Sequence, residues 1–500
     1  MVSTTSRRLA ASLAAGVVAA LAATGCTASA GDEAATGDGT LRAAFPGGAT
    51  ETLNYFQGPT ALDYVRARLV HAPLCELDPG SADGVAYGAV ESIEVSEDLA
   101  EYTLRVRDGV SFTDGADLTS ADVLYSLRAP GLLDGLPFTL LVARNFDLDA
   151  ASAPDESTVL LPTLAPIADG RELICQSMLA IQDGTTEFTP QTPSSGPFTI
   201  EAFEPGQSTR LERNPDFYGE APQLAAIELI SIPDGTARVN ALRQGQVDYT
   251  SALTPAQAQS LDGEDGIAVT TSELPYASYL QFTMDHEAAP FDDPEVRTAV
   301  RLAVDRERIV ENVYFGHAYV GNDLPALGFP SYHTGLEQRG HDPDQARQLL
   351  SDAGAEGASV ELVAGPELPG MVETATLIVE DLQAVGLDAT LRELPAGQLF
   401  ADYPAYLAMP FRAGFNPPAM FEPNYTPGAF PEVDELVQSA RSAPTAEERT
   451  AASHQAQELL WEEGDQLGVV FVPNLSAARD GISGVRELQF PDLAQASISG

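Results

Sequence analysis

The sequence predicts a mixed α/β protein with at least two lobes. Its 500 residues are enough for two or three compact units, and 44% of them are apolar, which is ample for large cores. Short segments with the two-residue period of strands alternate with helix-capping signals along the chain. No fixed repeat period appears, so solenoids and propellers are excluded.

A strand is predicted at residues 102–106, where apolar and polar side chains alternate as in a half-buried strand. The Asp-Gly pair at 108–109 predicts a two-residue hairpin turn after it. We therefore expect a return strand that begins at Val110 and ends at a second Asp-Gly pair, at 114–115.

Helix N-caps recur along the chain. Thr119 and Asp122 match a capping box, in which the threonine hydroxyl pairs with a free backbone N–H and the acid reaches back. Similar cap chemistry predicts four further helices, whose caps are Asp293, Asp305, Asp342 and Thr445. Arg297, beside Asp293 on the first of these helices, is expected to make a surface ion pair.

Residues 1–25 have the order of a signal peptide, because two arginines precede an apolar run at 9–23. The run is shorter than the roughly 20 residues that cross a bilayer, so we expect a soluble, exported mature chain. The small residues before Cys26 resemble a bacterial lipobox, which predicts a lipid anchor on that cysteine. Because Ala23 stands where a leucine is usual, an ordinary secretory peptide is the alternative. Residues 26–39 are small and polar, as in a flexible tether.

Cysteine content and charge restrict the class of protein. Beside Cys26, only Cys75 and Cys175 remain, and they are expected either to form a disulfide outside the cell or to stay as two buried thiols. The formal net charge is −47, and all 26 basic residues are arginine. Nucleic-acid binding is excluded, because phosphate contacts require a basic surface. An acidic surface that aids solubility is the simpler interpretation, and attraction of a cationic ligand is the alternative.

Seven ordered phrases lie between about residue 90 and residue 465. They are EYTLRVRDGVSFTDG with LTSADVLYSL (101–127), SGPF (195–198), LERNPDFY (211–218), RVNALRQGQVD (238–248), PFDDPEVRTAV (290–300), residues 425–436 and residues 447–461. Together they resemble family 5 of the extracellular solute-binding proteins, the dipeptide, oligopeptide and nickel binders of ABC importers. One phrase would be a weak indication, whereas seven in the expected order are a strong one.

The resemblance implies a two-lobed α/β architecture, the periplasmic-binding-protein-like fold of type II with an extra subdomain and a ligand cleft between the lobes. By analogy, lobe I covers residues 40–274, with the subdomain near 60–188, and is completed by 473–500. Lobe II then covers 275–472. The phrases themselves are turn and cap chemistry, so we expect ligand contacts elsewhere, in the cleft.

The candidate site lies where a strand predicted at 406–411 runs into Arg412. In the oligopeptide-binding branch, the matching loop resembles Arg-Ala-Gly-Trp followed three residues later by an aspartate that pairs with the ammonium group of the ligand. Here Phe415 replaces the tryptophan and Pro418 the aspartate. A proline cannot hold an ammonium, so free-amine dipeptides should bind more weakly than acidic, amidated or N-blocked ligands, unless Glu422 substitutes.

Arg412 is expected to offer its guanidinium to a ligand carboxylate or phosphate, and a buried ion pair is the alternative. Phe415 is expected to stack on the ligand or, alternatively, to pack in the core. The other candidates are Gly414 for close backbone approach, Asn416 for hydrogen bonds to ligand backbone, and, across the cleft, Asn54, Tyr55 and Phe56.

The resemblance implies that the protein captures a peptide or related small solute, closes around it, and is recognised by the permease and ATPase subunits of an ABC importer. We expect a monomer on the outer face of the cytoplasmic membrane, or in the periplasmic space of a Gram-negative cell. Opine-like compounds, oligosaccharides and metal complexes stay open as ligands. A ligand-sensing surface receptor on the same fold and a secreted hydrolase are the alternatives. The hydrolase is disfavoured because catalytic and phosphate-binding motifs are missing, and neither a cofactor nor a metal is expected, since the six histidines are scattered without ligand spacing.

Overall fold

The computed structural model describes residues 39–58, 60–81, 84–176, 178–395, 398–416, 428–488 and 490–499. The predicted signal peptide, Cys26, Pro418 and Glu422 lie outside these residues, and so do the side chains of Phe415 and Asn416. Within the described part of the chain, no helix is long and apolar enough to cross a membrane.

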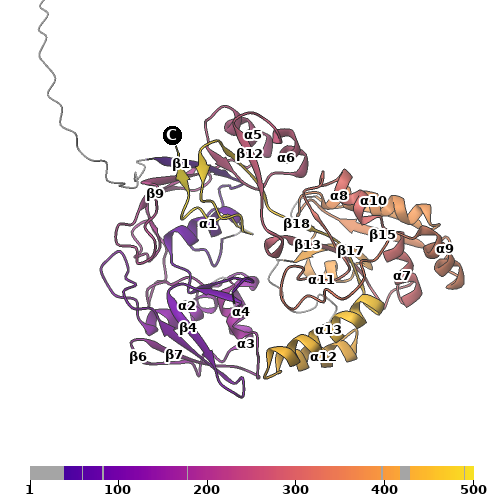
Figure 1. The fold of residues 1–500 in the computed structure, drawn as a ribbon, viewed down its shortest axis with the longest axis horizontal. Helices are drawn as coiled ribbons and strands as arrows, with labels where there is room; N and C mark the ends of the chain where they lie inside the picture. The colour runs from indigo at the N-terminus through magenta and orange to yellow at the C-terminus, as the bar shows by residue number, and fades with distance from the viewer. Residues whose placement is uncertain are drawn as a thin grey trace, which may run out of the picture. The chain divides into compact units, whose positions relative to one another are not determined.

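A seven-stranded sheet forms the core of lobe I (Figure 1). Its strands, in spatial order, are β12 (Ile267–Thr271), β19 (Leu475–Arg479), β11 (Tyr249–Thr250), β1 (Thr40–Phe45), β10 (Ala226–Ser231), β9 (Ser208–Arg213) and β8 (Phe198–Glu204). Strand β1 is parallel to both of its neighbours, and the other pairs are antiparallel. The associated elements are α1 (Ala61–Val70), α5 (Gly235–Arg243), α6 (Pro255–Leu261), β20 (Ile482–Ser483) and β21 (Ser497–Ile498).

A separate four-stranded sheet forms a subdomain within lobe I. Its strands, in spatial order, are β4 (Val90–Val95), β5 (Glu101–Val106), β7 (Thr158–Pro162) and β6 (Ser152–Asp155). Helix α2 (Ser120–Leu132), the short helices η1 (Pro137–Leu140), α3 (Leu141–Asn145) and α4 (Gly170–Cys175), and the hairpin of β2 (Cys75–Leu77) and β3 (Val85–Tyr87) complete it. The sheet and these helices share one apolar core, distinct from that of the seven-stranded sheet.

Strand β5 confirms the strand predicted at 102–106, whereas the return strand from Val110 is wrong. The chain does turn at Gly109, which has a φ of +80°. Strand β5 then pairs with β4 and β7 instead of with residues that follow the turn. The second Asp-Gly pair closes a tight turn of its own, in which the Phe112 N–H donates to the Ala116 carbonyl at 2.8 Å.

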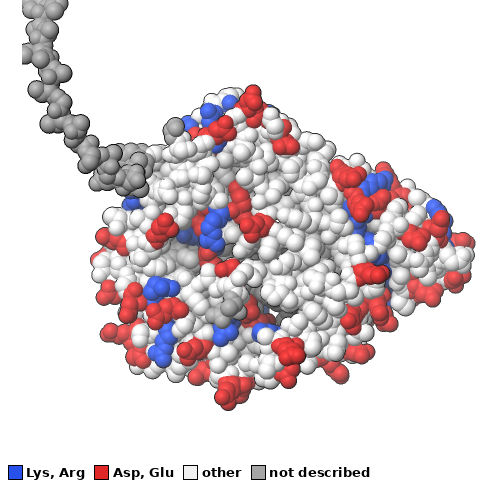
Figure 2. Space-filling model, viewed as in Figure 1, with Lys and Arg blue, Asp and Glu red and all other residues white. Residues whose placement is uncertain are grey.

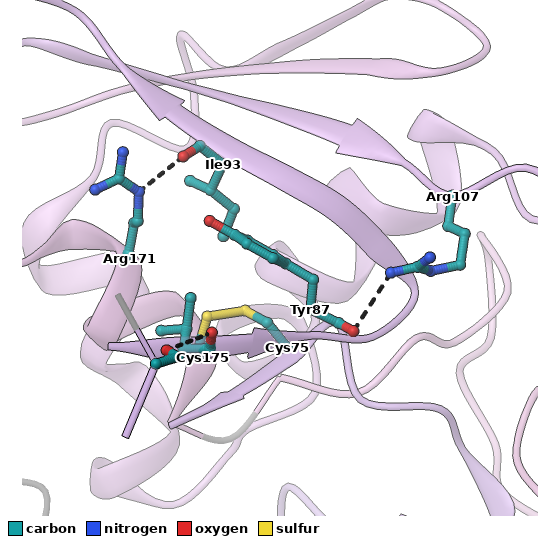
Figure 3. The surroundings of a disulfide bond; sticks show 8 residues. Cys75, Tyr87, Ile93, Arg107, Arg171 and Cys175 are labelled. Carbon is teal, nitrogen blue, oxygen red and sulfur yellow. Dashed lines mark hydrogen bonds between the residues drawn. A yellow bond between two sulfur atoms is a disulfide. The ribbon is translucent and has the colours of Figure 1, made fainter. Parts of the chain in front are cut away.

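A disulfide joins Cys75 on β2 to Cys175 at the end of α4, which is the bridged one of the two alternatives left open by the sequence. Figure 3 shows Tyr87 beside the sulfur atoms, and Arg171 donating its Nε–H to the Ile93 carbonyl at 2.7 Å. Both cysteines are buried. Because disulfides persist in oxidising compartments, this bridge agrees with export of the chain.

A six-stranded sheet forms the core of lobe II. Its strands, in spatial order, are β14 (Tyr319–Val320), β18 (Gln466–Val472), β13 (Ser278–Met284), β17 (Phe411–Asn416), β15 (Ser359–Ala364) and β16 (Asp388–Glu393). The helices are α7 (Pro294–Ala303), α8 (Arg306–Asn312), α9 (Pro343–Asp352), α10 (Met371–Ala384), α11 (Tyr403–Leu407), α12 (Pro431–Arg441) and α13 (Ala446–Glu463). Helices α12 and α13 pack side by side (Figure 1).

All five predicted N-caps are confirmed. The capping box at Thr119 begins α2, and the caps at Asp293, Asp305, Asp342 and Thr445 begin α7, α8, α9 and α13. Each cap is a local interaction between a side chain and the first turn of a helix, which is why the sequence alone predicts it.

Two other predictions in lobe II are wrong. Arg297 is 5% exposed and makes no surface ion pair; it donates to the main-chain oxygens of Gly464, Phe291 and Glu463. The strand predicted at 406–411 is absent: residues 406 and 407 end helix α11 (Tyr403–Leu407), residues 408–410 form a turn, and strand β17 begins only at Phe411. Asp402 caps this helix by accepting from the Ala405 N–H, a signal that the apolar run at 406–411 obscured.

The chain crosses between the two large sheets twice, after β12 and after β18. The first crossing contains η2 (Leu274–Tyr276) and the second is residues 473–474. Two hydrogen bonds tie the crossings together: the Ser272 N–H donates to the Asn474 carbonyl, and the Asn474 N–H donates to the Ser272 Oγ, both at 2.9 Å. The paired crossings connect the two large sheets, and the domain limits given above stay predictions.

Candidate functional site

Strand β17 carries the main candidate residues in the interior of the lobe II sheet. It is antiparallel to β13, with Arg412 opposite Thr283 and Gly414 opposite Gln281. Successive side chains of a strand point to opposite faces. Phe411 lies fully buried in the main lobe II core, so Arg412 and Gly414 belong to the other face of the sheet.

Arg412 is a buried cation with an incomplete set of partners. It is 7% exposed, and its Nη1 donates to the Met409 carbonyl at 2.9 Å. Among the described residues, its buried Nε has no hydrogen-bond partner and no carboxylate pairs with the guanidinium. The alternative of a buried ion pair therefore finds no partner in the described part of the chain. The edge formed by Nε and Nη2, which binds a carboxylate with two parallel hydrogen bonds, is left for another acceptor.

Tyr406 supports the Arg412 side chain and explains the glycine next to it. The guanidinium carbon lies 5.4 Å from the centre of the Tyr406 ring, and the Tyr406 hydroxyl donates to the Ala413 carbonyl at 3.2 Å. A Cβ at residue 414 would lie 2.8 Å from that hydroxyl. Gly414 thus makes room for the tyrosine, which in turn provides a ring face for the cation. Its predicted role in ligand approach stays a prediction.

Gln281 is a residue that the sequence did not single out. It is 6% exposed, lies opposite Gly414, and its Oε1 is buried without a partner. The signal that could have found it is a polar side chain within the otherwise apolar strand β13. Two incompletely paired polar groups, Gln281 and Arg412, therefore lie on one face of the sheet.

The lobe I candidates lie in an aromatic core. Tyr55 and Phe56 are 1% and 0% exposed, and their ring centres are 4.0 Å apart. Burial raises the pKa of the Tyr55 hydroxyl well above its ordinary value. Asn54 is half-buried, and its Oδ1 accepts from the Phe56 N–H at 3.2 Å. The structure brings these three residues together with one another, in contacts that are internal to lobe I, and their role in ligand binding stays a prediction.

A small cavity lies close to this aromatic core, lined in part by Arg66 and His71. Its volume of about 10 Å³ is that of a single water. Arg66 is fully paired there, with Glu51 at 2.6 Å and Asp63 at 3.0 Å. His71 is 4% exposed, its Nδ1 has no partner, and burial lowers its pKa to about 4. The cavity is too small to hold a solute.

The charge of the surface and the placement of metal-ligating side chains limit the ligands that it can bind. Figure 2 shows acidic side chains distributed over the visible face, in line with the net charge of −47. No group of three or more His, Cys, Asp or Glu among the described residues is placed to hold a metal ion.

Comparisons with known proteins agree with this fold. The chain is 24% identical over 462 residues to the probable di/tripeptide-binding protein 5 of Pseudomonas aeruginosa (strain UCBPP-PA14), which covers 82% of this chain and 86% of the relative. It is 23% identical over 431 residues to the glutathione-binding protein GsiB of Escherichia coli (strain K12), which covers 79% and 82%. Among solved structures, NikA of Brucella suis in complex with Fe(III)-EDTA aligns with a TM-score of 0.79 at 19% identity, over 92% of this chain and 100% of that one.

These structural neighbours are two-lobed periplasmic binding proteins of mixed α/β fold, which confirms the predicted fold class. The family model for bacterial extracellular solute-binding proteins, family 5 Middle, matches residues 84–432, more than half of the chain. Proteins of this family bind solutes and are not enzymes. The chain belongs to the family 5 extracellular solute-binding proteins.

Proposed function

We propose that this protein is the capture component of an ABC importer and that it binds a small solute carrying a carboxylate, a peptide or a related compound. The observation that supports this is the free Nε–Nη2 edge of Arg412, buried on a sheet face next to Gly414. A buried N–H without an acceptor is costly, and a ligand carboxylate is the anion whose geometry best matches the edge of a guanidinium.

The ligand class follows from two further considerations. The relatives are named for di/tripeptides and glutathione, and such ligands carry carboxylates. Pro418 stands where the oligopeptide-binding branch has an aspartate that pairs with the ammonium group of the ligand. This difference favours ligands whose amine is blocked or absent. The ligand is then held through its carboxyl end more than through an amino end.

Capture works by closure of the two lobes about the paired crossings at Ser272 and Asn474. A ligand that contacts both lobes binds the closed form better, so it shifts the equilibrium toward closure. The permease then recognises the closed form, and a lipid on Cys26 keeps the protein at the outer face of the membrane. The paired crossings support this motion, because they are short and leave each lobe its own core.

The first experiment is native mass spectrometry of the exported protein, followed by small-angle scattering with each ligand found. We expect a co-purified carboxylate of low molecular mass, and a smaller radius of gyration when it is bound. Scattering that stays unchanged at saturating ligand would exclude capture by closure. Mass spectrometry of the intact mature chain checks the anchor, because a lipidated Cys26 adds the mass of a diacylglyceryl group to it.

A further inference from the structure

Gln281 is a buried amide in the middle of β13, on the face of the sheet that carries Arg412. Leu280 and Phe282, its neighbours along the strand, are fully buried in the main core of lobe II, so Gln281 belongs to the opposite face. It is 6% exposed, and its Oε1 has no donor within the part of the chain that the structure describes. A buried polar atom without a partner destabilises a fold, so its presence calls for an explanation.

The β13–β17 register brings Gln281 close to Arg412. Gln281 lies opposite Gly414, and Arg412 lies opposite Thr283, two residues along the strand. Such diagonal positions on one face are about 7–8 Å apart, within reach of long side chains. Residue 414 carries no side chain, and the Gln281 Nε2 lies 3.8 Å from where a Cβ would be. The amide and the guanidinium therefore flank the same position on the sheet.

The two groups have complementary chemistry. Arg412 provides donors only, and its free edge suits a carboxylate. Gln281 provides an acceptor, its buried Oε1. Thr283, on the same face, differs from both because its hydroxyl already donates to the Gln466 Oε1 at 3.1 Å.

We infer that Gln281 is a specificity-determining residue, which accepts a hydrogen bond from an N–H or O–H of the ligand whose carboxylate Arg412 holds. This inference rests on the proposed function and narrows it. The ligands selected are carboxylates with a donor close to the acid, as in peptides and N-acyl amino acids. A carboxylate with an ester oxygen at that position would place two acceptors against each other.

Calorimetry with two matched probes tests the inference. The probes are N-acetyl-alanyl-alanine and the same compound with lactate as its last residue, which replaces one N–H by an oxygen. We expect the wild-type protein to bind the amide at least tenfold more tightly than the ester, and Gln281→Leu to reduce that preference to about twofold or less. Thr283→Val is the matched control on the same face and should keep the preference.

The outcomes separate this inference from the proposed function. Equal binding of the two probes by the wild-type protein, or a preference that Gln281→Leu retains, would overturn the role of Gln281 and leave the carboxylate site intact. Failure of the wild-type protein to bind either probe would remove both claims. The thermal unfolding of Gln281→Leu should be unchanged or higher than wild type, since the variant removes an unpaired buried group. A marked loss of stability would assign Gln281 a structural role instead.

Discussion

Lobe II holds buried arginines in two regions, and they differ in how completely they are paired. Behind β18, Arg306 donates to the Gly468 carbonyl at 3.0 Å, to the Arg301 carbonyl at 3.0 Å and to Asp323 at 2.6 Å. On β17, Arg412 has one acceptor among the described residues, the Met409 carbonyl. Both side chains are more than nine-tenths buried. Burial of an arginine alone therefore does not indicate a ligand site, and the proposed site rests on the unpaired Nε of Arg412 on the same sheet face as Gln281.

The buried arginines behind β18 have a structural role. Arg301 is fully buried and donates to the Gln466, Glu462 and Gly464 carbonyls, which joins α7 to the end of α13 and the start of β18. Burial lowers the pKa of Arg301 to about 10, so it stays charged at neutral pH. Burial opposes the ionisation of Asp323, but the neighbouring arginines outweigh it and hold the pKa of this carboxyl below its ordinary value. Each of the three guanidinium nitrogens of Arg301 and of Arg306 therefore donates to an acceptor of the protein itself.

The largest expected effect comes from removing a paired arginine. Arg306→Met leaves the Asp323 carboxylate with one of its two arginine partners and should lower the free energy of unfolding by about 3–5 kcal/mol. Urea unfolding measures it. Arg412→Met is the matched variant, because it leaves no carboxylate of the described residues without a partner. It should change the free energy of unfolding by less than about 1 kcal/mol. Equal losses in the two variants would contradict the contrast between the regions.

A second test uses His71, a basic group whose burial favours its neutral form. Its pKa of about 4 is below the unfolded value of 6.5, so the unfolded state binds more protons between these values. Stability should therefore fall by about 3 kcal/mol as pH drops from 6.5 to 4. His71→Leu should remove this part of the pH dependence, and the difference between the two unfolding curves isolates it from the carboxylates. A constant difference across that range would show that His71 does not titrate as described.

A third, smaller effect concerns Tyr406, whose ring faces the Arg412 guanidinium. Gly414→Ala places a Cβ 2.8 Å from the Tyr406 hydroxyl, which should cost about 1–3 kcal/mol in stability and weaken ligand binding. Gly131→Ala is the matched control, because a Cβ in that part of α2 meets no atom within 4 Å. It should be neutral or slightly stabilising. If Gly414→Ala behaves like this control in calorimetry and unfolding, Tyr406 does not support the site.

The sequence predicted what depends on local chemistry and failed where long-range contacts decide. The caps at Thr119 and Asp293 need only their own first turns, and both are confirmed. The hairpin at Val110 failed because β5 finds its partners in β4 and β7, remote from the turn. Arg297 was wrongly predicted to lie on the surface, because the periodicity of α7 does not reveal that the end of α13 packs over this residue.

The candidate site shows the same division. Arg412 followed from a family resemblance in the sequence, but its free edge is visible only once Met409 and Tyr406 are placed around it. Gln281 could not be found, because one polar residue in an apolar strand does not indicate which face lacks a partner. Pro418 stays a prediction from the sequence, since it lies outside the described residues.

Calorimetry on Arg412 tests the central claim most directly. The probes are N-acetyl-alanyl-alanine and its C-terminal amide, in which a neutral amide replaces the carboxylate that the guanidinium would meet. We expect the wild-type protein to bind the acid at least tenfold more tightly, and Arg412→Met to bind both compounds with similar, weak affinity while remaining folded. Undiminished binding of the acid by Arg412→Met would contradict the assignment of the free guanidinium edge to a ligand carboxylate.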